Sequence, residues 1–272
     1  MIEIDKELCT DCGWCVTDCP GNCIIKRDGE VFFKYPDFCI ECGHCAAGCP
    51  VEAVSVLNYS HDEIWNLAPE DYVVDPEKLQ NLFRFRRSVR IYRKQEVEPE
   101  KLEAVLQAGR YSPTGGNRQG LRYIVLRGQL EEIKIKVITF LNEMAGSWDE
   151  NNILYGYKEK LMDNYRKFLS KGVDRLFYKA PLVIIIAGTE GLPGEIIDGA
   201  LAASRMELLA SAMGLGVCFI GFFKFAADMD PSLTEKIGLQ KKEQVILAMT
   251  LGYPGVKYFR TVNRKALNVT YL

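Results

Sequence analysis

The chain has 272 residues, of which 48% are hydrophobic and 26% charged, and a formal net charge of −2 at pH 7, as in an ordinary soluble globular protein. Its longest apolar stretch, Leu182 to Ala187, is far shorter than the roughly 20 residues of a membrane-spanning helix, and the start MIEIDKELC lacks the apolar core of a secretion signal. Positions 1–60 hold ten acidic residues against four basic ones, so we expect a cytoplasmic protein that binds neither membranes nor nucleic acid.

Eight cysteines near the N-terminus form two copies of the spacing C-x2-C-x2-C-x3-C-P. They are Cys9, Cys12, Cys15 and Cys19 in the first copy and Cys39, Cys42, Cys45 and Cys49 in the second. This is the spacing of bacterial two-cluster ferredoxins, in which the fourth cysteine of each copy binds the other cluster. The spacing therefore predicts one [4Fe–4S] cluster on Cys9, Cys12, Cys15 and Cys49, and a second on Cys39, Cys42, Cys45 and Cys19.

Other uses of these cysteines fit less well. Zinc sites present separated C-x2-C pairs around one ion, and disulfide frameworks belong to short secreted chains. Cys23 and Cys218 are left over, and we expect both to be buried as small hydrophobic residues. His44 lies inside the second cysteine motif and His61 in the following segment, so neither is expected to be a catalyst.

The sequence divides into a small and a large part. We expect an α+β protein with a two-cluster ferredoxin domain at 1–57, a linker at 58–80 with a short helix around 64–67, and a second domain at 81–272. Residues 61–272 hold 30 basic against 26 acidic residues, which suits docking of the acidic first domain by charge complementarity. Small acidic domains are also simply soluble, so charge alone does not decide this.

Elements of the second domain follow from periodicity and proline placement. Helices are expected from Pro76 and over 99–109, and strands over 121–127, 181–188 and 245–251. The stretch 198–213 predicts a helix that is apolar on nearly every side, buried in a large core or in a dimer interface. Residues 140–178 fit an amphipathic helix packed on the body, with Leu161, Tyr165 and Phe168 on one face, or a lid over a binding site.

Two further segments carry binding chemistry. Residues 84–90 contain four arginines and a serine, and guanidinium groups bind phosphate through paired hydrogen bonds. On composition alone this run fits a solvated face equally well. Residues 112–119, SPTGGNRQ, form a turn-rich loop between a helix and a strand, whose bland interpretation is an ordinary Gly-Asn turn.

From about Leu82 to the C-terminus, the chain resembles the nitroreductase family of FMN proteins. The resemblance lies in four segments and their order: RRSVR, SPTGGNRQ, APLVIII and LGYP. With the cysteine motifs, the whole chain resembles the ferredoxin-fused nitroreductase-like proteins of anaerobes. The resemblance implies a mixed-sheet domain, FMN bound at the interface of a homodimer, and 198–213 as the long dimer helix.

The resemblance also implies positions for FMN-binding residues. Arg86 and Ser88 would bind the phosphate and ribityl chain, and Arg90 would lie beside the flavin N1/O2 edge, with Arg87 turned to structure or solvent. The loop would reach the flavin of the other subunit, and Gly221 would offer a backbone amide near N5. The remaining implied contacts are Pro113, Thr114, Gly115 and Asn117 in the loop, and Arg260 and Arg264, favoured over Lys265, at the phosphate.

These expectations combine into an oxidoreductase. Electrons from a low-potential donor, ferredoxin or NAD(P)H, would pass through the clusters to FMN and on to a flat nitroaromatic, quinone or activated alkene. The alternative is an electron-transfer module that relays electrons to or from a partner protein without a small substrate, or from NAD(P)H outward to the clusters. The sequence offers no convincing proton donor, and it lacks a G-x-G-x-x-G nicotinamide motif.

Overall fold

The computed structural model describes residues 1–60 and 62–272, so His61 lies outside the described residues. The chain divides into two compact units, one of residues 1–74 with 115–118 and one of residues 75–114 with 119–272. No helix within the described ranges combines the length and apolar composition that a membrane crossing needs.

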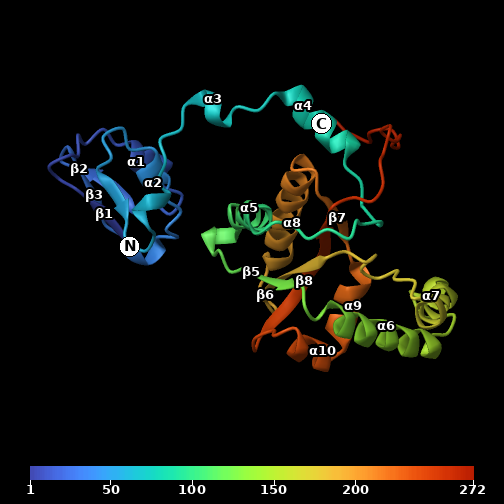
Figure 1. Cartoon of the computed structure of the whole chain (residues 1–272). Helices are drawn as coiled ribbons and strands as arrows, with labels where there is room; N and C mark the ends of the chain where they lie inside the picture. The colour runs from blue at the N-terminus through green and yellow to red at the C-terminus, as the bar shows by residue number, and fades with distance from the viewer. The chain divides into compact units, whose positions relative to one another are not determined.

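The first unit is built from two similar halves (Figure 1). Its strands are β1 (Ile2–Ile4), β2 (Ile24–Arg27), β3 (Glu30–Phe33) and β4 (Val54–Val56), with helices α1 (Trp14–Asp18), α2 (His44–Ala47) and α3 (Pro69–Tyr72) and the 3-10 turn η1 (Pro36–Phe38). Strand β1 pairs with β4, and β2 pairs with β3, both antiparallel. The β2–β3 hairpin turns at Asp28 and Gly29, which both have positive φ, as a two-residue hairpin loop requires.

The short helix predicted around 64–67 is wrong, because the helix of this segment starts later. Pro69 occupies the first helical position of α3, where a missing N–H costs nothing. The Asp71 carboxylate accepts a hydrogen bond from the Ala68 amide at 3.1 Å and so fixes the start. Ile64 and Trp65 are exposed apolar side chains outside that turn.

The second unit contains a four-stranded sheet of order β5–β6–β8–β7. Its strands are β5 (Arg122–Leu126), β6 (Leu182–Thr189), β7 (Gly216–Phe219) and β8 (Glu243–Gly252), and neighbouring strands pair antiparallel. A parallel bridge between Ser88 and Val217 extends the sheet beyond β7 and makes it mixed, as expected. The three strands predicted from sequence coincide with β5, β6 and β8.

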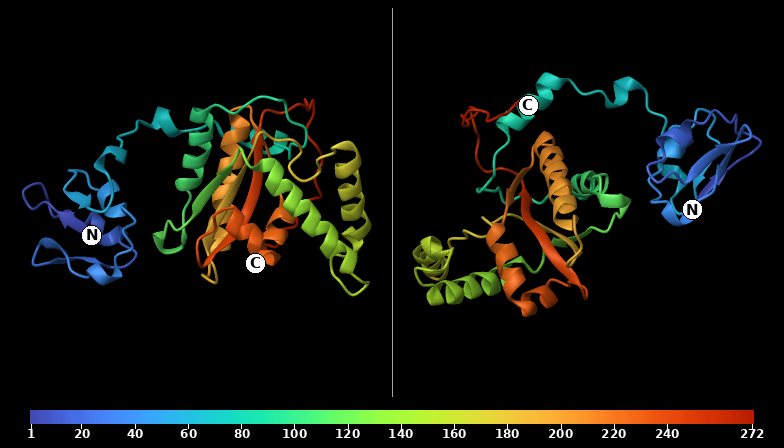
Figure 2. Two further views of the ribbon diagram at one scale, coloured as in Figure 1. Left: turned by 60° about the horizontal axis from the view of Figure 1, so that its bottom comes forward. Right: turned by 180° about the vertical axis from the view of Figure 1, so that it is seen from behind.

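Helices cover both faces of this sheet (Figure 2). Helices α5 (Pro99–Arg110) and α8 (Glu195–Ala212) lie on one face, and α6 (Leu130–Ser147) and α9 (Gly221–Met229) on the other. The remaining helices are α4 (Pro76–Phe85), α7 (Lys158–Lys171) and α10 (Pro231–Lys236), with 3-10 turns η3 (Gly115–Asn117) and η4 (Tyr155–Tyr157). Successive side chains of β6 pack into the cores on opposite faces of the sheet. Leu182, Ile184 and Ile186 pack toward α5 and α8, whereas Val183 and Ile185 pack toward α6 and α9.

Helix α8, predicted to be buried in a large core or in a dimer interface, is covered on one side only in the single chain, so the core alternative does not hold and the dimer interface stays a prediction. Ala203 and Met206 are buried, but Ile196, Ile197 and Leu201 are 61%, 65% and 43% exposed in the single chain. A helix that is apolar all round therefore has one covered face and one open apolar face.

Helix α7 follows the packing interpretation of residues 140–178. Leu161 is buried beside Trp148, and Tyr165 and Phe168 pack against the core between the sheet and α6. The connecting segment is fixed as well, since the Trp148 ring meets Phe225 edge-on at 6.1 Å and Tyr157 meets Phe222 at 5.6 Å. The segment is thus a packed part of the second unit.

Candidate functional site

The first unit contains two cavities lined by cysteines. One is lined by Cys9, Cys12, Cys15 and Cys49, and the other by Cys19, Cys39, Cys42 and Cys45 together with Cys23. Each cavity therefore takes three cysteines from one sequence repeat and the fourth from the other. This is the crossed grouping that the spacing predicts.

The same backbone conformation builds both cavities. Asp11 and Glu41 have φ of 52° and 51°, and Gly13 and Gly43 have φ of 85° and 75°, so each loop turns twice through the left-handed region before a short helix. After each motif the backbone returns an N–H to the last cysteine: Cys23 N lies 3.2 Å from Cys19 Sγ, and Ala53 N lies 3.2 Å from Cys49 Sγ. Such N–H···S bonds are typical partners of metal-bound thiolates.

The donor set fits an iron–sulfur cluster better than a single ion. Within residues 1–60 and 62–272 no three Cys, His, Asp or Glu side chains stand close enough together for one metal ion, although four cysteines line one cavity and five the other. Burial, together with the neighbouring thiols of Cys42 and Cys15, raises the pKa of Cys45 to about 11. Such thiols become ligands when a bound cation stabilises the thiolate, and a cluster brings this charge to all four at once.

In the second unit, the arginine segment runs from the end of α4 along the edge of the sheet. Arg86 ends α4, and Val89 donates its N–H to Val217 O at 2.9 Å, which anchors the segment on β7. Arg86 Nη1 donates to Glu207 Oε1 of α8 at 2.7 Å. Burial raises the pKa of Glu207, and Arg86 acts against this increase. The predicted phosphate ligand therefore holds a buried carboxylate in this structure.

Arg87 is turned to the chain itself, one of the two orientations expected from the sequence, but one of its nitrogens is left over. Its Nη1 donates to the carbonyls of Arg84 and Arg86, at 3.0 and 2.6 Å, and so fixes the guanidinium at the end of α4. Its Nη2 is buried and has no hydrogen-bond partner among the described residues. A buried cationic donor without an acceptor is costly, so this position suits an anionic ligand.

Ser112, the first residue of the predicted binding loop, shows the same feature. The residue is buried, and its Oγ has no hydrogen-bond partner within the described chain. The sequence assigned neither Ser112 nor Arg87 a contact with FMN. Burial of one polar atom without a partner leaves no signal in a linear pattern, so only the folded chain identifies them.

Arg90 lies in a small polar cluster with Tyr178 and Cys218. Its guanidinium carbon is 6.0 Å from the centre of the Tyr178 ring, and it interacts with the Cys218 thiol. Burial would lower the pKa of Arg90, but Cys218 and Tyr178 outweigh it, so the pKa is raised and the guanidinium stays charged. Cys218 is buried, as its sequence predicts, and so is Cys23.

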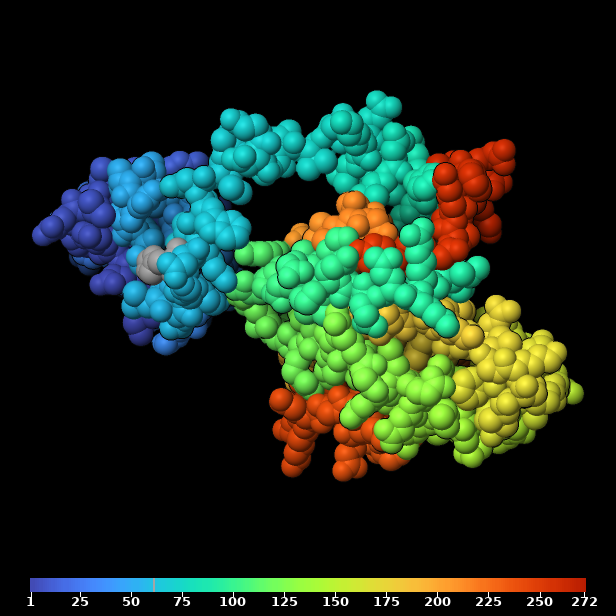
Figure 3. Space-filling model, viewed as in Figure 1, coloured from blue at the N-terminus to red at the C-terminus, as the bar shows by residue number. Residues whose placement is uncertain are grey.

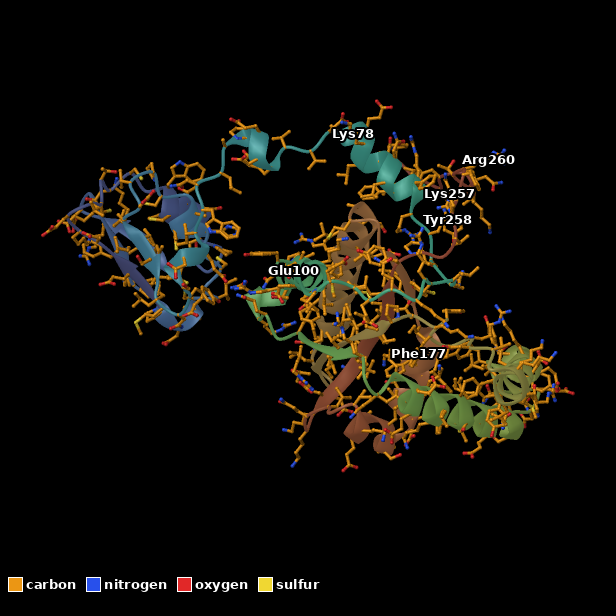
Figure 4. The ribbon with its side chains drawn as sticks, in the orientation of Figure 1. Lys78, Glu100, Phe177, Lys257, Tyr258 and Arg260 are labelled. Atoms are coloured by element: carbon orange, nitrogen blue, oxygen red, sulfur yellow. The ribbon has the colours of Figure 1, made fainter. Side chains whose placement is uncertain are left out.

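A buried carboxylate shapes the turn that carries Tyr178. The Asp174 side chain accepts hydrogen bonds from the amides of Leu176, Phe177 and Lys179 at 2.8–3.0 Å, and pairs with Lys134 Nζ at 3.2 Å. Tyr178 and Lys179 both have φ of 57°, a conformation that side chains disfavour and that is often retained at functional sites. Phe177 anchors the turn by packing on Phe223 at 6.0 Å between ring centres (Figure 4).

The other predicted contacts are placed separately. Pro113 and Thr114 precede η3, which contains Gly115 and Asn117, and Thr114 Oγ1 accepts the Gln119 amide at 3.0 Å across the turn. Gly221 is the first residue of α9, and a Cβ built on it meets nothing within 4 Å, so its backbone is open to a ligand. Their predicted roles toward FMN stay predictions.

Arg260 and Arg264 lie on the C-terminal segment 256–272, which has no regular secondary structure and is mostly exposed on the surface (Figure 3). Arg260 lies there together with Lys257 and Tyr258 (Figure 4). Tyr258 approaches the arginine segment closely enough to influence Tyr92. Burial, foremost, raises the pKa of Tyr92, whose hydroxyl bonds Thr250 Oγ1 at 2.7 Å.

A further cavity opens between α6, α7 and α9. Its walls are mostly apolar, and two polar side chains, Asn164 and Arg175, lie at it. The apolar wall residues are Ile138, Leu141, Leu161, Leu176 and Phe222. Phe222 follows Gly221, so this cavity adjoins the start of α9.

Comparisons with known proteins agree with this two-part organisation. Residues 83–253 match the model of the Nitroreductase family, and residues 8–54 match a 4Fe-4S dicluster domain. A provisionally named NADH dehydrogenase/NAD(P)H nitroreductase of Archaeoglobus fulgidus is 22% identical over 178 residues, which cover 65% of this chain and 86% of the relative. Iodotyrosine deiodinase of Hydra vulgaris is 20% identical over 192 residues, which cover 67% of this chain and 68% of the relative.

The fold of the second unit is also that of solved nitroreductases. The Bacteroides fragilis nitroreductase, whose structure contains bound FMN, has a TM-score of 0.57 and 21% identity over 71% of this chain and 99% of its own. This chain, an oxidoreductase with a 4Fe–4S ferredoxin domain at its N-terminus, belongs to the nitroreductase family.

Proposed function

We propose that this protein takes electrons from a low-potential donor through two [4Fe–4S] clusters to FMN and delivers them to a flat acceptor. The crossed grouping of the cysteines carries the proposal, because it builds two sulfur-lined cavities within the same chain as a nitroreductase-family unit. FMN, when bound, accepts electrons singly and delivers them in pairs, which is what joins clusters to a two-electron acceptor.

Arg87 and Ser112 are the groups that the FMN proposal explains best. A phosphate or ribityl oxygen would satisfy the buried Nη2 of Arg87 and the buried Oγ of Ser112. Ser88 remains a proposed ribityl ligand, and Arg86 would either support Arg87 through its backbone carbonyl or exchange Glu207 for the phosphate. Arg260 and Arg264 would add charge from the C-terminal segment.

Arg90 is proposed to stabilise the electron-rich N1/O2 edge. Its neighbours Cys218 and Tyr178 keep it charged, and a fixed cation at this edge favours the reduced cofactor. The open backbone of Gly221 would face N5. We assign no residue as proton donor.

The cavity beside Phe222 is proposed to bind the acceptor. Its apolar walls suit the faces of a nitroaromatic, quinone or activated alkene, and Arg175 and Asn164 offer hydrogen bonds to a polar substituent. Because α7 forms one wall and is packed against the core, residues 140–178 would shape a pocket without having to close over it.

A homodimer with FMN at its interface completes the proposal. The open apolar face of α8, with Ile196, Ile197 and Leu201, is the surface that a second copy would cover. Pro113, Thr114, Gly115 and Asn117 would contact the cofactor of the other subunit. A cytoplasmic location is proposed on the chemistry of exposed clusters.

The test begins with anaerobic purification and measurement of iron and FMN per chain. Flavin bleaching is then followed with reduced ferredoxin, and separately with NAD(P)H, before a nitroaromatic or quinone is added. Rapid bleaching by ferredoxin, followed by reoxidation with acceptor, is the expected result. Bleaching by NAD(P)H alone would reverse the direction of flow, reoxidation only by a partner protein would favour a relay, and absence of FMN would contradict the proposal.

A further inference from the structure

The two sequence repeats of the first unit fold almost alike, but at one buried position a cysteine in the first is matched by an alanine in the second. Cys23 and Ala53 each follow the fourth cysteine of their motif by four residues, and each is 2% exposed. The residues before them, Asn22 and Glu52, have φ of 49° and 54°. The backbone amides of Cys23 and Ala53 each donate to the Sγ of the fourth cysteine of their motif at 3.2 Å. The side chains of Cys23 and Ala53 therefore occupy equivalent places.

At this place one cavity has a thiol and the other has a methyl group. Cys23 lines the cavity of Cys19, Cys39, Cys42 and Cys45, and its thiol interacts with those of Cys19 and Cys39. Ala53 does not line the cavity of Cys9, Cys12, Cys15 and Cys49. The cysteine-lined environments are therefore chemically unequal.

A second difference shows that the structure accommodates this thiol specifically. A Cβ built on Gly21 would lie 2.8 Å from Cys23 Sγ and 2.8 Å from Phe38 O, so a side chain at position 21 would clash with the thiol. The equivalent residue of the other repeat is Val51, which lines its cavity. The first repeat thus combines Gly21 with Cys23, and the second combines Val51 with Ala53.

Hydrogen bonds to the sulfurs of an iron–sulfur cluster stabilise its reduced, more negative state and raise its reduction potential. A thiol is a weak hydrogen-bond donor and a polarisable neighbour, whereas a methyl group offers neither property. At this position, the cavity that contains Cys23 has a hydrogen-bond donor that its counterpart lacks; elsewhere the linings differ through Thr10 and Trp14 at the other cavity and His44 at this one.

We propose that Cys23 is a positioning residue that raises the reduction potential of the cluster held by Cys39, Cys42, Cys45 and Cys19, and so sets the order of the two clusters in electron transfer. This inference rests on the two clusters of the proposed function. Cys23 acts through the cluster sulfurs and is not itself a ligand.

The experiment is a redox titration of the full-length, cluster-loaded protein, followed by electron paramagnetic resonance with dithionite and mediators. Cys23→Ala copies the second repeat, Cys23→Ser retains a donor, and Val51→Gly with Ala53→Cys rebuilds the Gly–Cys arrangement in the second repeat. We expect Cys23→Ala to make one midpoint potential more negative and leave the other unchanged, with a smaller shift for Cys23→Ser. The paired change should make the other midpoint more positive.

The Cys23 variants and the paired Val51→Gly/Ala53→Cys variant test the inference independently. If Cys23→Ala does not retain iron, the paired variant decides, since it adds the thiol to the other cavity and removes nothing from this one. Unchanged midpoints in the variants that retain iron would overturn the inference while leaving the proposed function intact. A wild-type protein that binds no iron would overturn both, which iron analysis before the titration detects.

Discussion

The guanidinium of Arg87 should contribute strongly to FMN binding through one nitrogen. Its Nη2 is buried without a partner among the described residues, while Nη1 is fixed on two carbonyls. We predict that Arg87→Met weakens FMN binding about 10- to 100-fold, since a hydrogen bond to a charged group contributes about 1.5–3 kcal/mol. Calorimetric titration of the apoprotein with FMN measures it. Arg84→Met, which removes an exposed guanidinium bonded to Asn81 on the same helix, is the control and should change little.

Arg90 should influence the potential of the flavin more than its affinity. We predict that Arg90→Met makes the FMN midpoint potential more negative by about 30 mV, which for a two-electron couple corresponds to about 1.4 kcal/mol. Arg90→Lys should restore most of the shift, because the positive charge is what matters. Spectroelectrochemical titration of the FMN-loaded variants measures both. An unchanged midpoint potential in Arg90→Met would show that the positive charge of Arg90 does not stabilise the reduced flavin.

Among elements, the turn after α7 depends on one carboxylate. Asp174 is buried, accepts three amide hydrogen bonds and neutralises the mostly buried Lys134. We predict that Asp174→Asn lowers the free energy of unfolding by about 2 kcal/mol, because it replaces the buried carboxylate that accepts these amide hydrogen bonds, while Lys134 keeps its ion pair with Glu131. Urea unfolding measures it as a lower midpoint at unchanged slope. Asp163→Asn, which breaks the exposed pair with Lys167, is the control and should leave the urea midpoint almost unchanged.

A second ion pair links strands that are not neighbours in the sheet. Arg122 of β5 and Glu243 of β8 join across the end of β6, with Nε and Oε1 2.8 Å apart. Hydrogen bonding to Arg122, foremost, lowers the pKa of Glu243. A lowered native pKa gives stability that is present above the unfolded pKa, near 4.3, and is lost as the pH falls through the native value.

We therefore predict that Glu243→Gln destabilises the protein by about 1 kcal/mol at neutral pH, a value reduced by the partial exposure of Arg122. The difference from wild type should shrink as the pH falls below about 4. Urea unfolding at several pH values measures it. A difference independent of pH would mean that the glutamate acts through packing alone.

What could be predicted from sequence was local chemistry. The cysteine spacing predicts the crossed grouping because ligand geometry is encoded in adjacent residues, and Pro76 and Pro99 mark the starts of α4 and α5 because proline fits the first helical turn. Helix α6 was not predicted, although Ile133, Val137 and Leu141 lie on one face at helical spacing.

Long-range contacts were not predictable. Arg86 pairs with Glu207, 121 residues away, and nothing near either residue specifies the other. Whether Arg86 or Arg87 has a free, buried donor depends on that pairing. Adjacent residues of one chemical type exchange roles according to partners that only the tertiary fold supplies.

At the scale of the whole molecule, the two units differ greatly in hydrophobic core. The buried hydrophobic residues of the first, as far as the structure describes them, are few: Ile2, Cys23, Ile24, Val31, Cys45, Ala53, Val54 and Val56. A core of this size barely offsets the conformational entropy of folding without a metal or other cross-link. The second unit has cores on both faces of its sheet.

We therefore predict that removing iron unfolds residues 1–57 while β6 and β8 remain folded, because metal-binding free energy becomes folding free energy. Hydrogen exchange before and after anaerobic chelation measures this. Amides of β1 to β4 should lose their protection, whereas those of Ile184 to Ile186 should keep it. Persistent protection in the first unit without iron would show that its small core suffices.

The crossed cysteines have a topological consequence. A backbone cut at the exposed turn of Asp28 and Gly29 would give one fragment with Cys9, Cys12, Cys15 and Cys19 and another with Cys39, Cys42, Cys45 and Cys49. Each fragment would supply three ligands to one cluster and one to the other, so neither could depart without breaking both. With both proposed clusters bound, each would be held by cysteines of both fragments. The cut protein would therefore remain one particle until its iron was removed.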